Sequence, residues 1–163
     1  MTWQDSLPSA IDEVFDAMVE LRRHLHRNPE LSGEERKTSE HLSRLLQSNE
    51  VEARLGPDGR GVIADLSADS VTPRIALRAD IDALPIQDVK EVAYASQCAG
   101  VMHACGHDAH AALVFGAFRS IHTLANRGVL PFAPRVRAIF QPCLLYTSPS
   151  PRDATLSRMP SSA

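Results

Sequence analysis

The chain has 163 residues, of which 44% are hydrophobic and 23% are charged. This length suits one domain with its own core, and the composition is that of an ordinary globular protein, which argues against disorder along the whole chain. The net charge of −3 gives no attraction to nucleic acid or to an anionic membrane surface.

The N-terminal twenty residues lack the basic start and the apolar run of a secretory signal, and no stretch approaches the roughly 18 apolar residues of a membrane-spanning helix. We therefore expect no membrane partner and a cytoplasmic location. The cysteines are Cys98, Cys105 and Cys143, an odd and low number that does not suggest a disulfide scaffold. We therefore expect reduced thiols, and a metal ion is a candidate partner for them.

Two amphipathic helices are predicted near the N-terminus. The first has apolar residues at helical spacing and should end at Asn28-Pro29, because proline disfavours helical geometry in the residue before it. Its expected buried stripe is Ile11, Val14, Phe15, Met18 and Leu25. Ser32 followed by Glu35 predicts a capping box at the start of the second helix. Its expected buried stripe is Leu42, Leu45 and Leu46.

Short apolar runs bounded by turn residues predict strands over residues 51–55, 61–66, 74–79 and 135–141. Residues 84–102 show no clear period and predict an irregular surface loop. A third helix follows this loop and should end near Gly128, which suits a left-handed cap. Helices interleaved with strands predict the α/β class.

Residues 103–110, HACGHDAH, combine three histidines, a cysteine and an aspartate. If a helix began at His103, Cys105 and His107 would lie about 200° apart and could not reach one ion. If Gly106 instead marks the junction between loop and helix, both side chains can converge. Thiolate and imidazole suit a borderline-soft ion such as zinc.

Two other interpretations of HACGHDAH stay open. The residues could be the polar start of a buried helix, with the cysteine acting as a small hydrophobe. Cys105 could also be a nucleophile with His107 as its base, but residues two apart would need strained geometry for that pair, and no third orienting group is evident. No glycine-rich phosphate loop occurs, so the sequence gives no support for a nucleotide site.

Asp80 and Asp82 lie at the carboxyl end of the third predicted strand, where ligand crevices of open α/β sheets are found. Alternation along the strand would place both carboxylates on one side. They could bind metal, orient a ligand or tune a base. A solvated strand end is the alternative.

Four segments resemble a known family, and they occur in its order over about residues 10–142. They read LRRHLHRNPELSGEE, RADIDALPIQ, GVMHACGHDAHAAL and RAIFQP. Together they resemble the dinuclear-metal amidohydrolases and metallopeptidases of the aminoacylase, carboxypeptidase and hippurate hydrolase family. The similarity is greatest to the N-acyl-amino-acid amidohydrolase branch, which includes plant hydrolases of indoleacetic acid conjugates.

This resemblance implies an α/β catalytic domain of the zinc-peptidase type, in which helices flank a mixed sheet. A smaller lid domain is normally inserted further along, and the parent protein could form a homodimer through it. The resemblance also implies two divalent metal ions, whether zinc, manganese or cobalt, and hydrolysis of the amide bond of N-acyl amino acids or similar small conjugates.

Site residues carry over by position in the motifs. Cys105 and His107 match metal ligands, with the cysteine bridging the two ions. Asp82 matches the catalytic aspartate that orients the metal-site ligands, and Asp80 is its neighbour in the motif. His103 and His110 lie in the motif but are not assigned as ligands.

The family pattern stops after Pro142. In the family, the strand ending in Gln-Pro continues into Ala-Glu-Glu, of which one glutamate is the general base and the next is a metal ligand. Here Cys143-Leu144-Leu145 follows, and LLYTSPSPRD resembles translated sequencing-adapter read-through. We expect residues 1–142 to be the N-terminal part of the catalytic domain. Residues 143–163 are expected to be a tail foreign to the family, either disordered or artefactual.

The parent protein is therefore expected to be a metal-dependent amidohydrolase. This chain, without the catalytic glutamate, is expected to show no appreciable turnover. The alternative is a noncatalytic fragment that binds one ion through Cys105 and His107. A third possibility is a fragment that does not fold, because its sheet would be left with unpaired edges.

Overall fold

The computed structural model describes residues 2–66 and 75–142, and residues 143–163 of the expected tail lie outside that range. In chain order the main elements are α1 (Trp3–Arg27), α2 (Arg36–Gln47), β1 (Glu52–Leu55), β2 (Val62–Leu66), β3 (Ile75–Asp80), α3 (His107–Asn126) and β4 (Val136–Gln141). The predicted α/β class is confirmed, and so are the four expected strands, each within one residue at either end.

The strands form one mixed sheet in the order β1-β2-β4-β3. Strands β1 and β2 pair antiparallel, as do β2 and β4, whereas β3 and β4 run parallel. Alternate residues of β2 and β4 are buried on one face of the sheet. They are Val62, Ala64, Leu66, Val136, Ala138 and Phe140.

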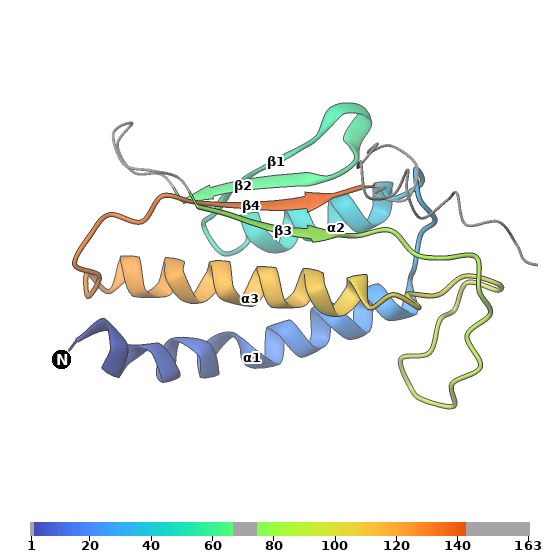
Figure 1. The fold of residues 1–163 in the computed structure, drawn as a ribbon, viewed down its shortest axis with the longest axis horizontal. Helices are drawn as coiled ribbons and strands as arrows, with labels where there is room; N and C mark the ends of the chain where they lie inside the picture. Colours follow the sequence, from blue (N-terminus) through green and yellow to red (C-terminus); the bar gives the residue numbers. More distant parts are fainter. Residues whose placement is uncertain (1, 67–74, 143–163) are drawn as a thin grey trace, which may run out of the picture.

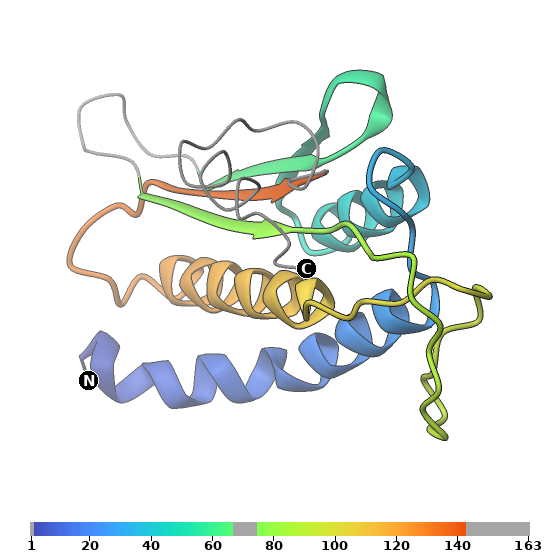
Figure 2. The same ribbon diagram turned by 45° about the vertical axis from the view of Figure 1, so that its right-hand side comes forward.

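The three helices lie on that buried face (Figure 1). Helix α3 packs against β3 and β4, α2 packs against β1, and α1 forms a further layer against α3. Figure 2 shows the same layers from a second direction. Among the described residues, no helix combines the length and the apolar character that crossing a bilayer requires.

Helices α1 and α3 approach closely through small residues. The Ser120 hydroxyl donates to the backbone oxygen of Ala10 at 3.4 Å. A Cβ atom added at Gly116 would lie 2.1 Å from the sulfur of Met18. The expected stripe on α1 was therefore partly wrong, because Ala10 faces α3 while Ile11 and Phe15 are 42% and 56% exposed.

We expect Gly116→Val to destabilise the fold by about 1–3 kcal/mol, because the new side chain overpacks the contact between α1 and α3. A lower midpoint of urea unfolding would show this. The double variant Met18→Ala/Gly116→Val should recover part of the loss, since it removes the side chain that the valine meets. A single variant as stable as the wild type would contradict the close packing.

The N-terminus of α2 is capped from a distance. The predicted capping box is wrong: Glu35 is the N-cap residue, but no side chain of the cap accepts a hydrogen bond from the helix. Instead, the Glu30 carboxylate accepts from the backbone nitrogens of Lys37 and Thr38, at 3.3 and 2.7 Å. The chain before α2 is held by a bridge between Leu31 and Ala83, so tertiary pairing overrides the local capping signal.

Two histidines stack where α1 meets α2. The rings of His24 and His41 have centroids 3.7 Å apart and planes 12° apart. Burial lowers the pKa of His41 to about 4, and the charges of His24 and Arg44 act in the same direction. The folded protein therefore favours a neutral ring at position 41.

This pKa predicts a loss of stability in acid. An unfolded histidine titrates near pH 6.5, so between about pH 6.5 and pH 4 the unfolded chain binds more protons than the folded one, and stability falls as the pH falls. We expect His41→Gln to reduce the drop between pH 7 and pH 4.5 by on the order of 1 kcal/mol, allowing for screening of a half-exposed ring. Urea unfolding of both proteins at the two pH values measures this, and equal drops would contradict it.

Candidate metal centre

Asp82 is fixed beyond the end of β3 by neighbours on both sides. The Ile81 amide donates to the backbone oxygen of Gln141 at 3.1 Å, and the Ala83 amide donates to that of Glu30 at 2.8 Å. Residues 81–83 are each at most 2% exposed. The backbone around Asp82 is therefore held in the interior, and its carboxylate lies beyond the carboxyl end of β3, as predicted.

A left-handed glycine positions Cys105 and His107. Gly106 is the N-cap of α3 with φ of 79°, a conformation that glycine adopts without steric cost. Of the two alternatives for this motif, the structure shows the one in which Gly106 marks the junction between loop and helix. Cys105 stays in the loop and is exposed, while His107 is the first residue of the helix. This is the arrangement in which the sequence predicts that both side chains face one ion. We name residues 105–107 the Cys-Gly-His turn.

Asp82 orients the ring of His107. The Nδ1 atom of His107 lies 2.9 Å from the backbone oxygen of Asp82 and also 2.9 Å from the Oδ1 atom of the Asp82 carboxylate. A proton on Nδ1 can be donated to the backbone oxygen, with the carboxylate beside it, which leaves the lone pair on Nε2. Metal-binding histidines in proteins are commonly oriented in this way, by a carboxylate or a backbone carbonyl behind the ring.

The donor set fits a divalent ion in part. Cys105 offers a sulfur and His107 an imidazole nitrogen, and both carboxylate oxygens of Asp82 are buried without a hydrogen-bond partner. Within residues 2–66 and 75–142, however, no group of three or more histidine, cysteine, aspartate or glutamate side chains converges to hold a metal ion. Since zinc sites usually have three or four protein ligands, the described residues supply part of a site.

The other charged residues of the two motifs do not join these three. The Asp80 carboxylate pairs with Arg78 at 2.7 Å. His110 is exposed, and its ring centroid lies 6.1 Å from that of His107. Burial lowers the pKa of His103 to about 4, although the charge of Asp108 acts in the opposite direction. His103 is therefore a buried ring that favours its neutral form.

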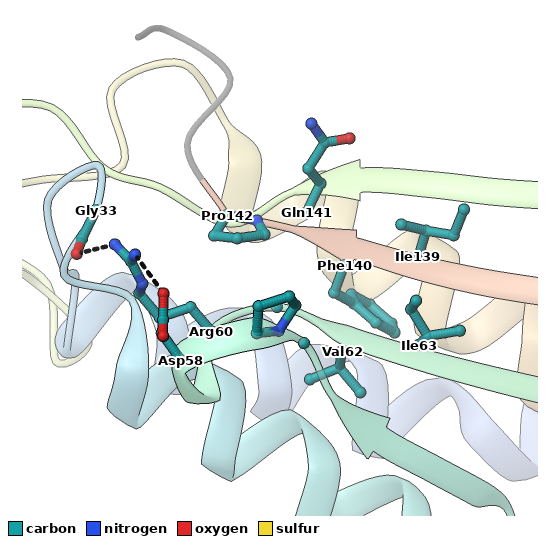
Figure 3. Close-up of a pocket in the computed structure, with 12 residues that line it drawn as sticks. Gly33, Asp58, Arg60, Val62, Ile63, Ile139, Phe140, Gln141 and Pro142 are labelled. Carbon is teal, nitrogen blue, oxygen red and sulfur yellow. Dashed lines mark hydrogen bonds and ion pairs between the residues drawn. The ribbon is translucent and has the colours of Figure 1, made fainter. Parts of the chain in front are cut away.

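A cavity of about 600 Å³ lies elsewhere, at the carboxyl end of β4 (Figure 3). Val62, Phe140 and Pro142 supply apolar surface, and Arg60 is held by the Gly33 backbone oxygen and the Asp58 carboxylate. Asp82, Cys105 and His107 do not line it. The cavity is thus separate from the candidate metal centre.

Comparison with known proteins identifies the family. Residues 76–143, which include Asp82 and the Cys-Gly-His turn, match the model described as peptidase family M20/M25/M40. The crystal structure of the Bacillus subtilis YXEP protein, described as a dinuclear metal binding peptidase from the M20 family, matches with a TM-score of 0.70. It is 39% identical in sequence, and the match covers 80% of this chain and 36% of that chain. Residues 76–143 of the chain belong to peptidase family M20/M25/M40.

Curated relatives match over most of this chain. The N-acetyl-L-cysteine deacetylase of Bacillus subtilis is 39% identical over 139 residues, which are 85% of this chain and 32% of the relative. The IAA-amino acid hydrolase ILR1-like 2 of Arabidopsis thaliana is 44% identical over 126 residues, 75% of this chain and 28% of the relative. The chain thus spans about a third of the length of these relatives, of which one is named a deacetylase and the other a hydrolase.

Two buried residues near the site were not found by sequence reasoning. His26 on α1 is 1% exposed, and Asp88 in the loop after β3 is 9% exposed. A signal for His26 was present in the sequence, because it directly follows Leu25 of the predicted apolar stripe. A histidine near the buried leucines of an amphipathic helix is such a signal. We found no local signal for Asp88.

Proposed function

We propose that residues 1–142 form the first part of the catalytic domain of an M20 amidohydrolase that cleaves the amide bond of N-acyl amino acids or similar small conjugates. The observation that carries the proposal is the orientation of His107 by buried Asp82, next to a cysteine on a left-handed glycine turn. Deacetylase and amino acid hydrolase names among the curated relatives support the substrate class.

In this proposal Cys105 and His107 hold divalent metal, and Asp82 is the catalytic aspartate that positions them. When bound, two divalent ions of zinc, manganese or cobalt supply Lewis acidity that polarises an amide carbonyl and acidifies water. Asp82 keeps the proton of His107 on Nδ1, so that Nε2 remains a ligand. The buried carboxylate also fixes the ring plane, which reduces the reorganisation that binding requires.

The isolated chain is proposed to be inactive. Its described residues offer two ligands on one turn and no converging group of three or more ligand side chains, and loss of a general base alone costs about 10²–10⁴-fold in rate. The tail at residues 143–163 is proposed to be foreign to the M20 domain. With added manganese or zinc, we expect no measurable hydrolysis of N-acetyl amino acids or hippurate; turnover of about 1–10³ s⁻¹, as in ordinary enzymes, would contradict this.

A chimera tests the function of the segment itself. Residues 1–142 would replace the corresponding segment of the Bacillus subtilis N-acetyl-L-cysteine deacetylase, which supplies the rest of the domain. We expect hydrolysis of N-acetyl-L-cysteine at a rate about 100-fold or more above that of the same chimera carrying His107→Ala. A folded chimera that binds metal but is inactive would favour the noncatalytic metal-binding alternative, and equal rates in both chimeras would exclude the proposed ligand role.

A further inference from the structure

His26 lies between two carboxylates from distant parts of the chain. Its Nδ1 atom is 2.7 Å from Oδ2 of Asp108, in the first turn of α3. Its Nε2 atom is 3.3 Å from Oδ2 of Asp88, which belongs to the surface loop of residues 84–102. All three side chains are at most 2% exposed. One buried ring therefore contacts both segments.

The contact with Asp108 holds the start of α3. Asp108 directly follows the Cys-Gly-His turn, and Arg22 adds a second contact from α1, with its Nε atom 3.0 Å from the same carboxylate oxygen. Because His26 and Arg22 are one helical turn apart on α1, they hold the Asp108 carboxylate against one face of that helix. The first turn of α3 is thereby fixed to α1.

The contact with Asp88 holds the surface loop. The Asp88 carboxylate accepts from the backbone amides of Lys90 and Ser96 at 3.1 and 2.9 Å. The Lys90 ammonium lies 3.1 Å from Oδ1 of Asp88 and 3.2 Å from Nε2 of His26. With a proton on Nδ1, the ring can donate to Asp108, and Nε2 can then accept from the Lys90 ammonium, which links the ring to Asp88. A single tautomer of His26 thus forms a hydrogen bond with Asp108 on α3 and another with Lys90 in the loop.

Other contacts keep the loop near α1 if His26 is changed. The Gln97 amide donates to the backbone oxygen of Arg27 at 2.9 Å, and the Arg27 side chain donates to that of Ala93 at 3.2 Å. In Figures 1 and 2 the loop lies beside the C-terminal end of α1. A substitution at His26 should therefore loosen the link without undocking the loop.

We infer that His26 is a positioning residue that couples the surface loop to the Cys-Gly-His turn. The inference rests on the proposed metal site. Coupling is reciprocal: if the loop, through His26, holds the turn in a ligand-ready form, a metal on the turn must also stabilise the loop. A purely structural histidine would change stability but would not transmit metal binding to the Ser96 amide.

The test measures amide hydrogen exchange and zinc affinity on the full 163-residue chain. In the wild type, zinc should slow exchange of the Ser96 amide about threefold or more. In His26→Gln this slowing should disappear, and zinc should bind about tenfold more weakly. His26→Asn can still donate to Asp108 and should retain more of the affinity. His122→Gln, on the part of α3 away from the turn, is the matched control and should behave as the wild type.

Equal zinc affinity and equal slowing in wild type and His26→Gln would overturn the inference. If the wild type binds no zinc, that result contradicts the proposed metal site and not the coupling. The coupling is then tested by hydrogen exchange in the metal-free chain. There, Asp108→Asn should speed exchange of the Ser96 amide several-fold, although the Asp108 carboxylate contacts Arg22 and His26 on α1 rather than the loop. An unchanged Ser96 rate in that variant would overturn the coupling on its own.

Discussion

Asp82→Asn should bind cobalt(II) about 10–100-fold more weakly than the wild type, while its stability stays within about 1 kcal/mol. The substitution keeps the shape of the side chain and the backbone oxygen that accepts from His107, but removes the negative charge beside Nδ1. Loss of a carboxylate behind a metal-binding histidine typically costs this much affinity. Titration followed by the cobalt absorption spectrum, with urea unfolding in parallel, measures both quantities.

Asp80→Asn is the matched control for this prediction. Asp80 belongs to the same motif, but its carboxylate pairs with Arg78 rather than with His107. Its affinity should stay within about twofold of the wild type, since an exposed ion pair contributes little. Equal weakening in the two variants would show that the motif acts through its overall charge and not through the orientation of His107.

Phe118→Ala should lower the free energy of unfolding by about 3–5 kcal/mol, because it leaves a large cavity in the core. Phe118 is fully buried on α3 and belongs to the main hydrophobic cluster. Single domains are stable by only about 5–15 kcal/mol, so the loss is a large part of the total. Urea unfolding followed by circular dichroism measures it.

Leu113→Ala provides the comparison on the same helix. Leu113 is 59% exposed, and substitutions at such positions usually change stability by less than about 0.5 kcal/mol. If both variants unfold at the same urea concentration as the wild type, Phe118 does not fill the core between α3 and the sheet, and the described packing is contradicted. If neither they nor the wild type unfold cooperatively, the chain does not fold by itself.

Local signals accounted for most of the fold. Turn residues bounded the four strands, Asn28-Pro29 ended α1, and Gly106 marked the start of α3. Each of these signals acts through the conformation of one or two residues, so the sequence alone reveals it. The resemblance to the M20 family then directed attention to Asp82, which the structure places beside His107.

Long-range contacts were the part that could not be predicted. Glu30 caps α2 from outside the helix, so the capping box expected from Ser32 and Glu35 was wrong. His26 and Asp108 are 82 residues apart, and no periodicity within either helix reports such a pair. The buried face of α1 was misjudged for the same reason: the close approach of Ser120 on α3 to the backbone of Ala10 favours a small residue there over a large apolar one.

Titration of the full chain with cobalt(II) tests the central claim most directly, because a thiolate bound to cobalt gives a charge-transfer absorption band. If Cys105 and His107 hold the ion, the band should appear and saturate in the wild type and in Cys98→Ser. It should be absent in Cys105→Ser, and His107→Ala should bind about 100-fold more weakly. A band of unchanged strength and affinity in Cys105→Ser or in His107→Ala would contradict the claim.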